Sequence, residues 1–217
     1  MRFRAAIFDL DGTLLDTLED LAGAMNRVLR RHGLPAHPVS AYRGFIGEGI
    51  EALVRRALPR PLPPPDALAA RVREMREEYD RRCLERTRPF PGVRELLSAC
   101  RGAGMELAVL TNKPEEAARR LLECLLPGEG FGVVCGALPG RPRKPDPAGA
   151  RELLAALGVA PGQAFLLGDS AVDMQAAAAA GLYPVGALWG YRGAEELLEA
   201  GARLLCPAPA DLIPWVS

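Results

Sequence analysis

The sequence predicts an α/β protein with a doubly wound parallel sheet and an inserted all-helical cap. After residue 89, short apolar runs alternate with helical patterns, which is typical of a parallel sheet covered by helices on both faces. Another apolar run lies near the N-terminus, and the intervening residues 17–88 show helical patterns only. We therefore expect a core made of residues 1–16 and 89–217, with residues 17–88 as the cap.

Length and composition exclude several classes of protein. The chain has 217 residues, 49% of them apolar, which fits one domain with a smaller insert and a sizeable core. Basic and acidic residues balance at 27 each, so we expect neither a nucleic-acid nor a membrane partner. There is no apolar run of about 18 residues, as a membrane-spanning helix requires. The short apolar segment at the N-terminus is followed by acids, which favours a cytoplasmic protein, and five scattered cysteines fit neither a disulfide scaffold nor a zinc site.

The first part of the chain predicts one strand followed by three helices. Residues 4–8 are apolar and lead into Asp-Leu-Asp-Gly, as a buried strand does where it meets a tight turn. Thr17 and Asp20 resemble an N-cap pair at the start of the first helix, and the second helix covers about 48–58. After a proline-rich break, we expect Asp66 to cap a long third helix. The apolar face of this helix repeats at helical spacing through Leu68, Val72, Met75, Tyr79 and Cys83.

The second part alternates between helices and strands. Its strands are short and apolar throughout, so each is expected to lie buried between layers of helices. The expected helices are 93–101, 115–125, 148–157, 172–180 and 194–200, and the expected strands are 105–110, 132–135, 164–167, 183–187 and 203–206.

Polar residues gather where three of the predicted strands end and where one later helix begins. Ligands of an open parallel sheet bind beyond the carboxyl ends of its strands, so these residues predict one composite site. Its members are Asp9, Asp11, Thr111, Asn112, Lys144, Asp169 and Asp173.

The composition singles out two lysines. Of the 27 cations, 25 are arginine, and only Lys113 and Lys144 are lysine. A chain that uses arginine so widely is expected to keep lysine where a compact ammonium group is required, and we therefore assign Lys144 to the site. For Lys113, a solvent-facing position and a functional one fit the sequence equally well.

The carboxylates of the composite site predict bound Mg²⁺. Asp9 and Asp11 stand two residues apart, and like charges that close require a cation or a shared proton. Asp169 adds a third carboxylate, and Asp173 is a candidate for an outer one. An oxygen-only set without His or Cys suits Mg²⁺, which prefers carboxylates, waters and a substrate phosphate. The groups expected to hold phosphoryl oxygens are Lys144, Thr111 and the backbone near Asn112.

These motifs, in this order, resemble those of the haloacid dehalogenase superfamily, in its phosphatase branch. The resemblance covers essentially the whole chain and implies a Rossmann-like core with a helical cap. Within the superfamily, Thr111-Asn112-Lys113-Pro114 and the tail from Ala179-Ala180-Gly181 to Gly190-Tyr191 are most similar to phosphoglycolate phosphatases. The four motifs are Asp9-Leu10-Asp11-Gly12-Thr13, Thr111-Asn112, Lys144 and Gly168-Asp169-Ser170-Ala171-Val172-Asp173.

The resemblance implies that a phosphate monoester is hydrolysed in two steps, through an aspartyl phosphate. Asp9 would be the nucleophile, Asp11 the general acid and base, and Lys144 a neutralising charge at the reacting centre. Mg²⁺ would bind Asp9, Asp169 and the backbone carbonyl of Asp11, with Asp173 as a candidate further ligand. The implied substrate is a small phosphorylated metabolite, with 2-phosphoglycolate favoured.

The cap carries weaker indications of a substrate contact. Gly47 and Gly49 belong to a glycine-rich turn whose backbone can approach a ligand closely. Arg43 beside this turn is a candidate partner for a substrate carboxylate.

Other functions stay open at this point. A pyrophosphatase or a sugar-phosphate phosphatase would use the same motifs, and a phosphomutase would also have to retain its phosphorylated product. A haloacid dehalogenase would share Asp9 but does not need the carboxylate of Asp11. A non-catalytic binding protein on this fold could lose Asp11, which is present here. We expect a monomer or a homodimer.

Overall fold

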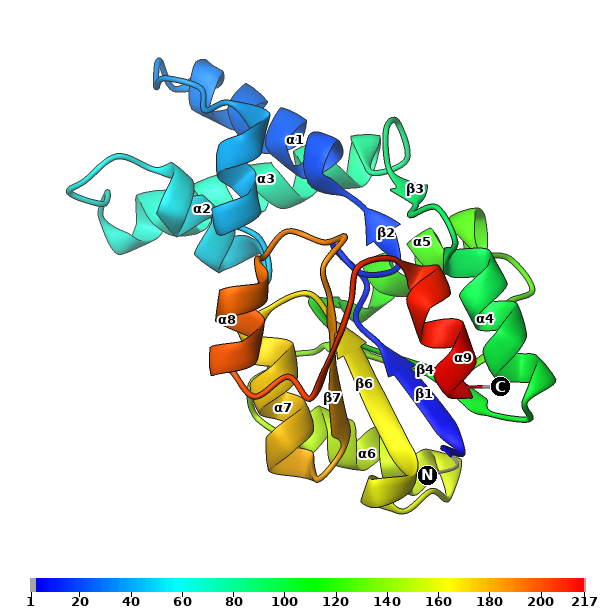
Figure 1. The fold of residues 1–217 in the computed structure, drawn as a ribbon. Coiled ribbons are helices and arrows are strands. Elements are labelled where there is room, and N and C mark those ends of the chain that lie inside the picture. Colours follow the sequence, from blue (N-terminus) through cyan, green and yellow to red (C-terminus); the bar gives the residue numbers. More distant parts are fainter. Residues whose placement is uncertain (1–2, 217) are drawn as a thin grey trace.

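The computed structural model describes residues 3–216 and contains a six-stranded sheet in the order β5–β4–β1–β6–β7–β8 (Figure 1). Every neighbouring pair of these strands is parallel, which confirms the predicted doubly wound sheet. Residues 1, 2 and 217 of the predicted core lie outside the described residues. The strands are β1 Ala5–Phe8, β4 Glu106–Pro114, β5 Phe131–Ala137, β6 Ala164–Gly168, β7 Tyr183–Ala187 and β8 Leu204–Cys206.

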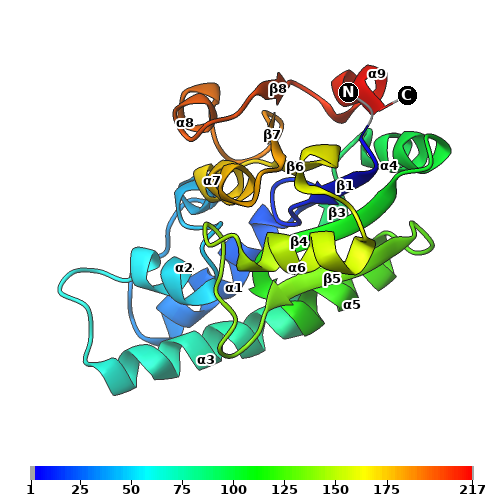
Figure 2. The same cartoon turned by 90° about the horizontal axis from the view of Figure 1, so that it is seen from below.

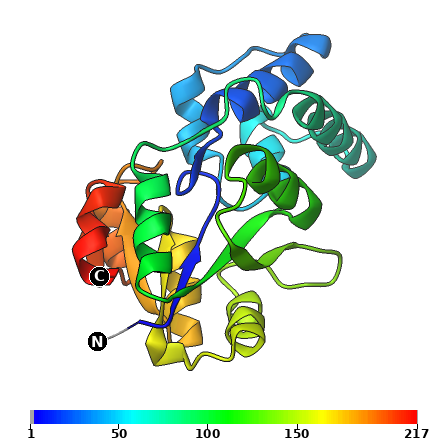
Figure 3. The ribbon, with the colours of Figure 1, turned by 90° about the vertical axis from the view of Figure 1, so that its right-hand side faces the viewer.

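Alternate side chains of β1, β4, β5 and β6 enter two separate hydrophobic clusters, one on each face of the sheet. In β1, Ala5 and Ile7 belong to one cluster, and Ala6 and Phe8 belong to the other, as the two-residue period of a strand requires. The first face is covered by α6 Ala148–Leu157 and α7 Ala171–Ala180, beside which α8 Ala194–Glu199 packs. The other face is covered by α4 Val93–Gly102, α5 Glu115–Leu125, the 3₁₀ turn η3 Pro209–Leu212 and α9 Ile213–Val216 (Figures 2 and 3).

Strand β4 is longer than predicted. The sequence placed its end at residue 110, but the strand continues to Pro114, which pairs with Ala137 of β5. A register shift between Leu110 and Pro114 bulges the strand at this point. The three residues of the bulge, 111–113, therefore belong to the end of the strand and remain tied to the sheet.

A helical segment, residues 18–82, lies beyond the carboxyl ends of the strands (Figure 1). Two short strands connect it to the sheet, β2 Leu15–Asp16 and β3 Arg88–Pro89, and they pair with each other antiparallel. Within residues 3–216, none of the helices combines the length and apolar character needed to cross a membrane. The segment consists of α1 Leu18–Arg31, the 3₁₀ turn η1 Val39–Gly44, α2 Ile50–Ala57 and α3 Pro65–Arg82.

Two expected helix caps are wrong. Thr17 makes no side-chain cap at α1, and the Asp20 carboxylate instead accepts hydrogen bonds from Arg86 N–H and from the N–H and hydroxyl of Thr87. These donors lie buried in the chain that returns to the sheet, and they make more hydrogen bonds to the Asp20 carboxylate than the N–H groups at the start of α1 would. Helix α3 begins at Pro65, one residue before Asp66, because proline at a first helical position has no N–H to leave unpaired.

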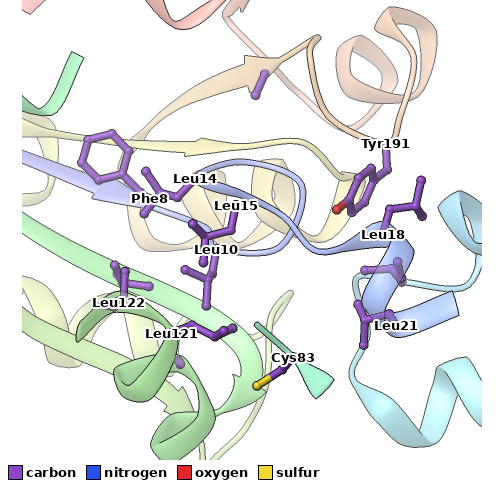
Figure 4. Close-up of a cluster of buried hydrophobic side chains, with 14 of the residues drawn as sticks. Phe8, Leu10, Leu14, Leu15, Leu18, Leu21, Cys83, Leu121, Leu122 and Tyr191 are labelled. Atoms are coloured by element: carbon purple, nitrogen blue, oxygen red, sulfur yellow. The ribbon is translucent and has the colours of Figure 1, made fainter. Parts of the chain in front are cut away.

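The hydrophobic core continues from the sheet into the helical segment. Figure 4 shows Phe8 of β1, then Leu10 and Leu14 of the following loop, and finally Leu18 and Leu21 of α1. All of them are buried in one cluster. The helical segment is therefore packed against the core through apolar side chains as well as through its two connections.

The buried carboxylate of Glu78 in α3 links α3 to α1 through ion pairs. Its side chain is 2% exposed and accepts hydrogen bonds from Arg31 of α1 and Arg82 of α3. Burial alone would raise the pKa of Glu78, but the hydrogen bonds from Arg82 and Arg31 outweigh burial and lower it. The ionised form of Glu78 therefore stabilises the folded protein.

We predict that Glu78→Gln lowers the free energy of unfolding by about 1–3 kcal/mol at neutral pH, because charge-assisted hydrogen bonds are lost. Since the folded-state pKa is below the unfolded one, the difference from wild type should be present above about pH 4.3 and shrink below it. Urea unfolding at several pH values measures this. Glu85→Gln is the matched control, because Glu85 is 53% exposed and pairs with the same Arg82. Equal effects of the two variants at all pH values would contradict the assignment.

Candidate active site

The predicted site residues meet where the strand order reverses. Strand β1 lies between β4 and β6, so the chain leaves β1 in one direction to form β4 and β5 and returns on the other side to form β6. Asp9 follows β1, and Asp169 follows β6. This switch point is the place where open parallel sheets bind their ligands.

Lys144 reaches the same place from the loop before α6. Its Nζ lies 2.7 Å from Asp9 Oδ1, 2.6 Å from Asp173 Oδ1 and 2.8 Å from the carbonyl oxygen of Leu110. Burial would lower the pKa of Lys144, but the charges of Asp173 and Asp9 outweigh burial and raise it. Lys144 therefore remains an ammonium ion inside the protein.

Asp9, Asp169 and Asp173 form a buried cluster of carboxylates. One oxygen from each lies within 4.8 Å of the others. Burial raises the pKa of Asp9 to about 7, against the opposing effect of Lys144, and raises that of Asp169 to about 8. Repulsion from neighbouring carboxylates contributes to both of these shifts. A bound cation would reduce that repulsion.

The cluster fits Mg²⁺. It supplies oxygen ligands only, and two of its members are already oriented: Asp169 accepts from the Thr13 hydroxyl and Tyr191 N–H, and Asp173 accepts from Ser170. Asp9 Oδ1 lies 2.7 Å from Lys144 Nζ, and within residues 3–216 it makes no other polar contact. An oxygen so placed is available to a metal ion or a phosphorus atom.

Three glycines leave the space that the carboxylates occupy. A Cβ on Gly12, whose φ is +89°, would lie 2.4 Å from Asp169 Oδ2, and one on Gly190 would lie 2.3 Å from Asp169 Cβ. A Cβ on Gly168 would lie 2.4 Å from Asp173. Gly12, Gly168 and Gly190 all stand in the quoted motifs, but the sequence did not show that they serve the carboxylates.

Asp11 does not join the carboxylate cluster. Its carboxylate, 14% exposed, accepts two hydrogen bonds from Lys113 Nζ at 2.9 and 3.0 Å. Lys113 also donates to the hydroxyl of Tyr79 in α3, at 3.0 Å. A solvent-facing position for Lys113 is therefore wrong, since its side chain is 4% exposed. The apolar repeat of α3 predicted that Tyr79 is buried, but gave no sign of its polar contact.

The residues of the β4 bulge hold the loops around the site. The Thr111 hydroxyl accepts a hydrogen bond from Lys113 N–H. The Asn112 side chain donates to the carbonyl oxygens of Gly47 and Lys144, both at 3.0 Å, and accepts from Lys144 N–H at 2.9 Å. The amide of Asn112 thus joins the sheet to a turn of the helical segment.

A pocket of about 30 Å³ lies between the sheet and the helical segment. The structure brings Gly47 and Gly49 to its wall, as expected, but not Arg43, whose Nη1 donates to the carbonyl oxygen of Gly190. A backbone acceptor thus holds Arg43 away from the pocket wall. The lining residues from the sheet side are Asp9, Asp11, Thr111, Asn112, Lys113 and Pro114, and those from the helical side are Leu21, Ile46, Gly47, Gly49, Ile50 and Leu53.

Comparison with known proteins agrees with this geometry. The sequence pattern of the haloacid dehalogenase-like hydrolases matches residues 6–187. A phosphoglycolate phosphatase of Pseudomonas putida is 39% identical over 97% of this chain and 79% of its own length. A solved structure from Lactobacillus delbrueckii subsp. bulgaricus, assigned by inference as a phosphoglycolate phosphatase, is 29% identical, with a TM-score of 0.92 over 100% of this chain and 99% of that one. A mutant of CbbY from Rhodobacter sphaeroides, solved with xylulose-(1,5)bisphosphate, is 27% identical, with a TM-score of 0.78 over 97% and 96% of the two chains.

The chain therefore belongs to the haloacid dehalogenase-like hydrolases. Within that family its relatives confirm the predicted class of enzyme, a phosphatase. The identity extends over almost the whole chain, so it includes the helical segment as well as the sheet.

We predict that Gly190→Ala displaces Asp169, because the new methyl group would also lie 2.5 Å from the backbone oxygen of Gly12. Stability should fall by about 1–3 kcal/mol, as in other overpacked sites. Affinity for Mg²⁺ should fall ~10- to 100-fold, as when a group that supports a metal ligand is disturbed. Thermal unfolding and calorimetric titration measure the two effects. The control is Gly193→Ala, where no atom lies within 4 Å of the new methyl group; wild-type Mg²⁺ binding in Gly190→Ala would refute the prediction.

Proposed function

We propose that this protein is a Mg²⁺-dependent phosphatase that hydrolyses 2-phosphoglycolate through a phosphorylated Asp9. The observation that carries the proposal is the buried Asp9, which lies at the wall of the pocket and whose Oδ1 contacts Lys144 as its one polar partner among the described residues. A division into a core of residues 1–16 and 89–217 and a cap of residues 17–88 is part of the proposal, since the pocket lies between the two.

In the first step, Asp9 forms a bond to phosphorus and the bond from phosphorus to the substrate oxygen breaks. Asp11 gives a proton to the leaving alcohol. Lys144, 2.7 Å from Asp9, stabilises the negative charge of the nucleophile and of the transferring group. Thr111 and the backbone at Asn112 hold phosphoryl oxygens at the opposite wall of the pocket.

In the second step, a water molecule attacks phosphorus and the bond from phosphorus to Asp9 breaks. Asp11 accepts the proton of that water, so both carboxylates return to their starting state as phosphate leaves. Asp9, Asp169 and Asp173, with the backbone carbonyl of Asp11, would hold Mg²⁺. When bound, Mg²⁺ supplies positive charge for the phosphoryl oxygens and lowers the repulsion between the carboxylates.

The pocket favours a small substrate. Its volume is about 30 Å³, and its helical wall is formed by apolar side chains and by Gly47 and Gly49. Both glycines have positive φ, +116° and +89°, so their backbone turns toward the site without side chains to block it. A space of about 30 Å³ is close to the volume of one water molecule, so any phosphate ester requires the helical segment to move outward, and 2-phosphoglycolate requires less movement than a larger ester. Relatives named phosphoglycolate phosphatase support this substrate.

A sugar phosphate is the second candidate. It is supported by the structural likeness to the CbbY mutant that binds xylulose-(1,5)bisphosphate. The small pocket argues against it, because a sugar bisphosphate would require a larger outward movement of the helical segment than 2-phosphoglycolate.

We expect wild type to release phosphate from 2-phosphoglycolate with a kcat/KM at least ~10-fold above that for pyrophosphate or sugar phosphates, and only with Mg²⁺ present. Asp9→Asn should be inactive on all of them while remaining folded, because the amide keeps the shape and loses the nucleophile. Acid quenching of wild type with labelled substrate should leave the label on Asp9. Activity in Asp9→Asn would refute the mechanism, and a preferred sugar phosphate would change the substrate.

We expect Lys144→Arg to lose at least ~10²-fold in kcat, although the charge is kept. The ammonium is enclosed by Asp9, Asp173 and the carbonyl of Leu110, and a planar guanidinium is too large and too rigid for those three acceptors. Steady-state kinetics measures the loss, and circular dichroism checks the fold. Near-normal turnover would show that the site does not require a compact cation.

A further inference from the structure

Lys113 joins the carboxylate of Asp11 to the hydroxyl group of Tyr79. Lys113 Nζ donates to both Asp11 oxygens and to Tyr79 Oη, and it lies 4.6 Å from the centre of the Tyr79 ring. Lys113 comes from the β4 bulge, whereas Tyr79 comes from α3 of the helical segment. Parts of the chain that are far apart thus fix one carboxylate.

The two lysines of the chain have separate partners. Lys144 contacts Asp9 and Asp173, and Lys113 contacts Asp11 and Tyr79. Lys144 therefore balances charge in the carboxylate cluster, and Asp11 is the only carboxylate whose charge Lys113 balances. Because both Asp11 oxygens accept hydrogen bonds from one ammonium group, the carboxylate is held in a single orientation as a proton acceptor.

We propose that Lys113 and Tyr79 are positioning residues that hold Asp11 as the base for hydrolysis of the aspartyl phosphate. The inference rests on the proposed function. In that half-reaction the water oxygen forms a bond to phosphorus, its proton passes to an Asp11 oxygen, and the bond from phosphorus to Asp9 breaks. A freely rotating Asp11 would meet the water less often in the required geometry.

Acetyl phosphate separates the two half-reactions, because acetate leaves without needing a proton. Within the first turnover after rapid mixing, acetate release measures phosphorylation of Asp9, and phosphate release measures hydrolysis of the phosphorylated enzyme. In Lys113→Met with Mg²⁺, we expect acetate release within ~3-fold of wild type and phosphate release at least ~10-fold slower. Phosphorylated enzyme should accumulate and be visible by acid quench. Tyr79→Phe, which keeps the ring and its packing, should show the same pattern with a smaller effect.

Tyr42→Phe is the matched control. Tyr42 is also buried in the helical segment, and its hydroxyl donates to Asn26, away from Asp11. This variant should leave the ratio of the two rates unchanged even if stability falls.

Three results would overturn the positioning role. Equal slowing of acetate and phosphate release would show that Lys113 acts on the phosphoryl group or on the fold. A rise confined to the KM for 2-phosphoglycolate would show that Lys113 binds the substrate carboxylate. Retention of wild-type hydrolysis in both variants would show that Asp11 needs no support. Failure of the wild type to release phosphate from any ester would instead refute the proposed function, and this inference with it.

Discussion

The ion pair between Lys144 and the buried carboxylates is the interaction on which the site depends. Three acidic side chains within 4.8 Å of one another, all removed from water, repel each other strongly. Lys144 lies against two of them and also contacts a carbonyl of β4. One ammonium group therefore neutralises part of the carboxylate charge and is itself fixed to the sheet. The glycines around Asp169 and Asp173 follow from the same constraint, because the carboxylates must be packed tightly enough to stay in reach of one cation.

The site draws on both parts of the chain in different ways. The sheet and its helix α7 supply Asp9, Asp169 and Asp173, whose positions are set by strand ends and by hydrogen bonds within the core. The helical segment supplies the apolar wall, the glycine turn and Tyr79. Asp11 stands between them, since its neighbour Lys113 contacts the core on one side and α3 on the other. The site is therefore complete only when the helical segment is packed against the sheet.

Much of this could be predicted from the sequence, because buried strands and strand-end polar clusters leave local patterns. The sheet, its covering helices and the meeting of Asp9, Lys144 and Asp169 were predicted from such patterns. The polar contacts of Tyr79 and Asp20 could not be predicted from such local patterns. The period of α3 correctly buried Tyr79, but its polar partner is 34 residues away, and Asp20 left its local helix end for donors 66 and 67 residues further along. The end of β4 was misjudged because pairing with β5 resumes beyond the bulge, and no local pattern reports that.

The pairing of β2 with β3 places the two connections of the helical segment side by side. Because the two connections are adjacent, any outward movement of the segment would turn about this one pair of strands, while Lys144 and the carboxylates keep their places. Beside the apolar packing around α1, the contacts across the opening include hydrogen bonds from Asn112 to Gly47, Lys113 to Tyr79, Arg43 to Gly190, Arg192 to Ile46 and Arg120 to Asp80. Hydrogen bonds of this kind exchange readily with water. Release of phosphate would require these contacts to break, so their strength would bear on the rate of turnover.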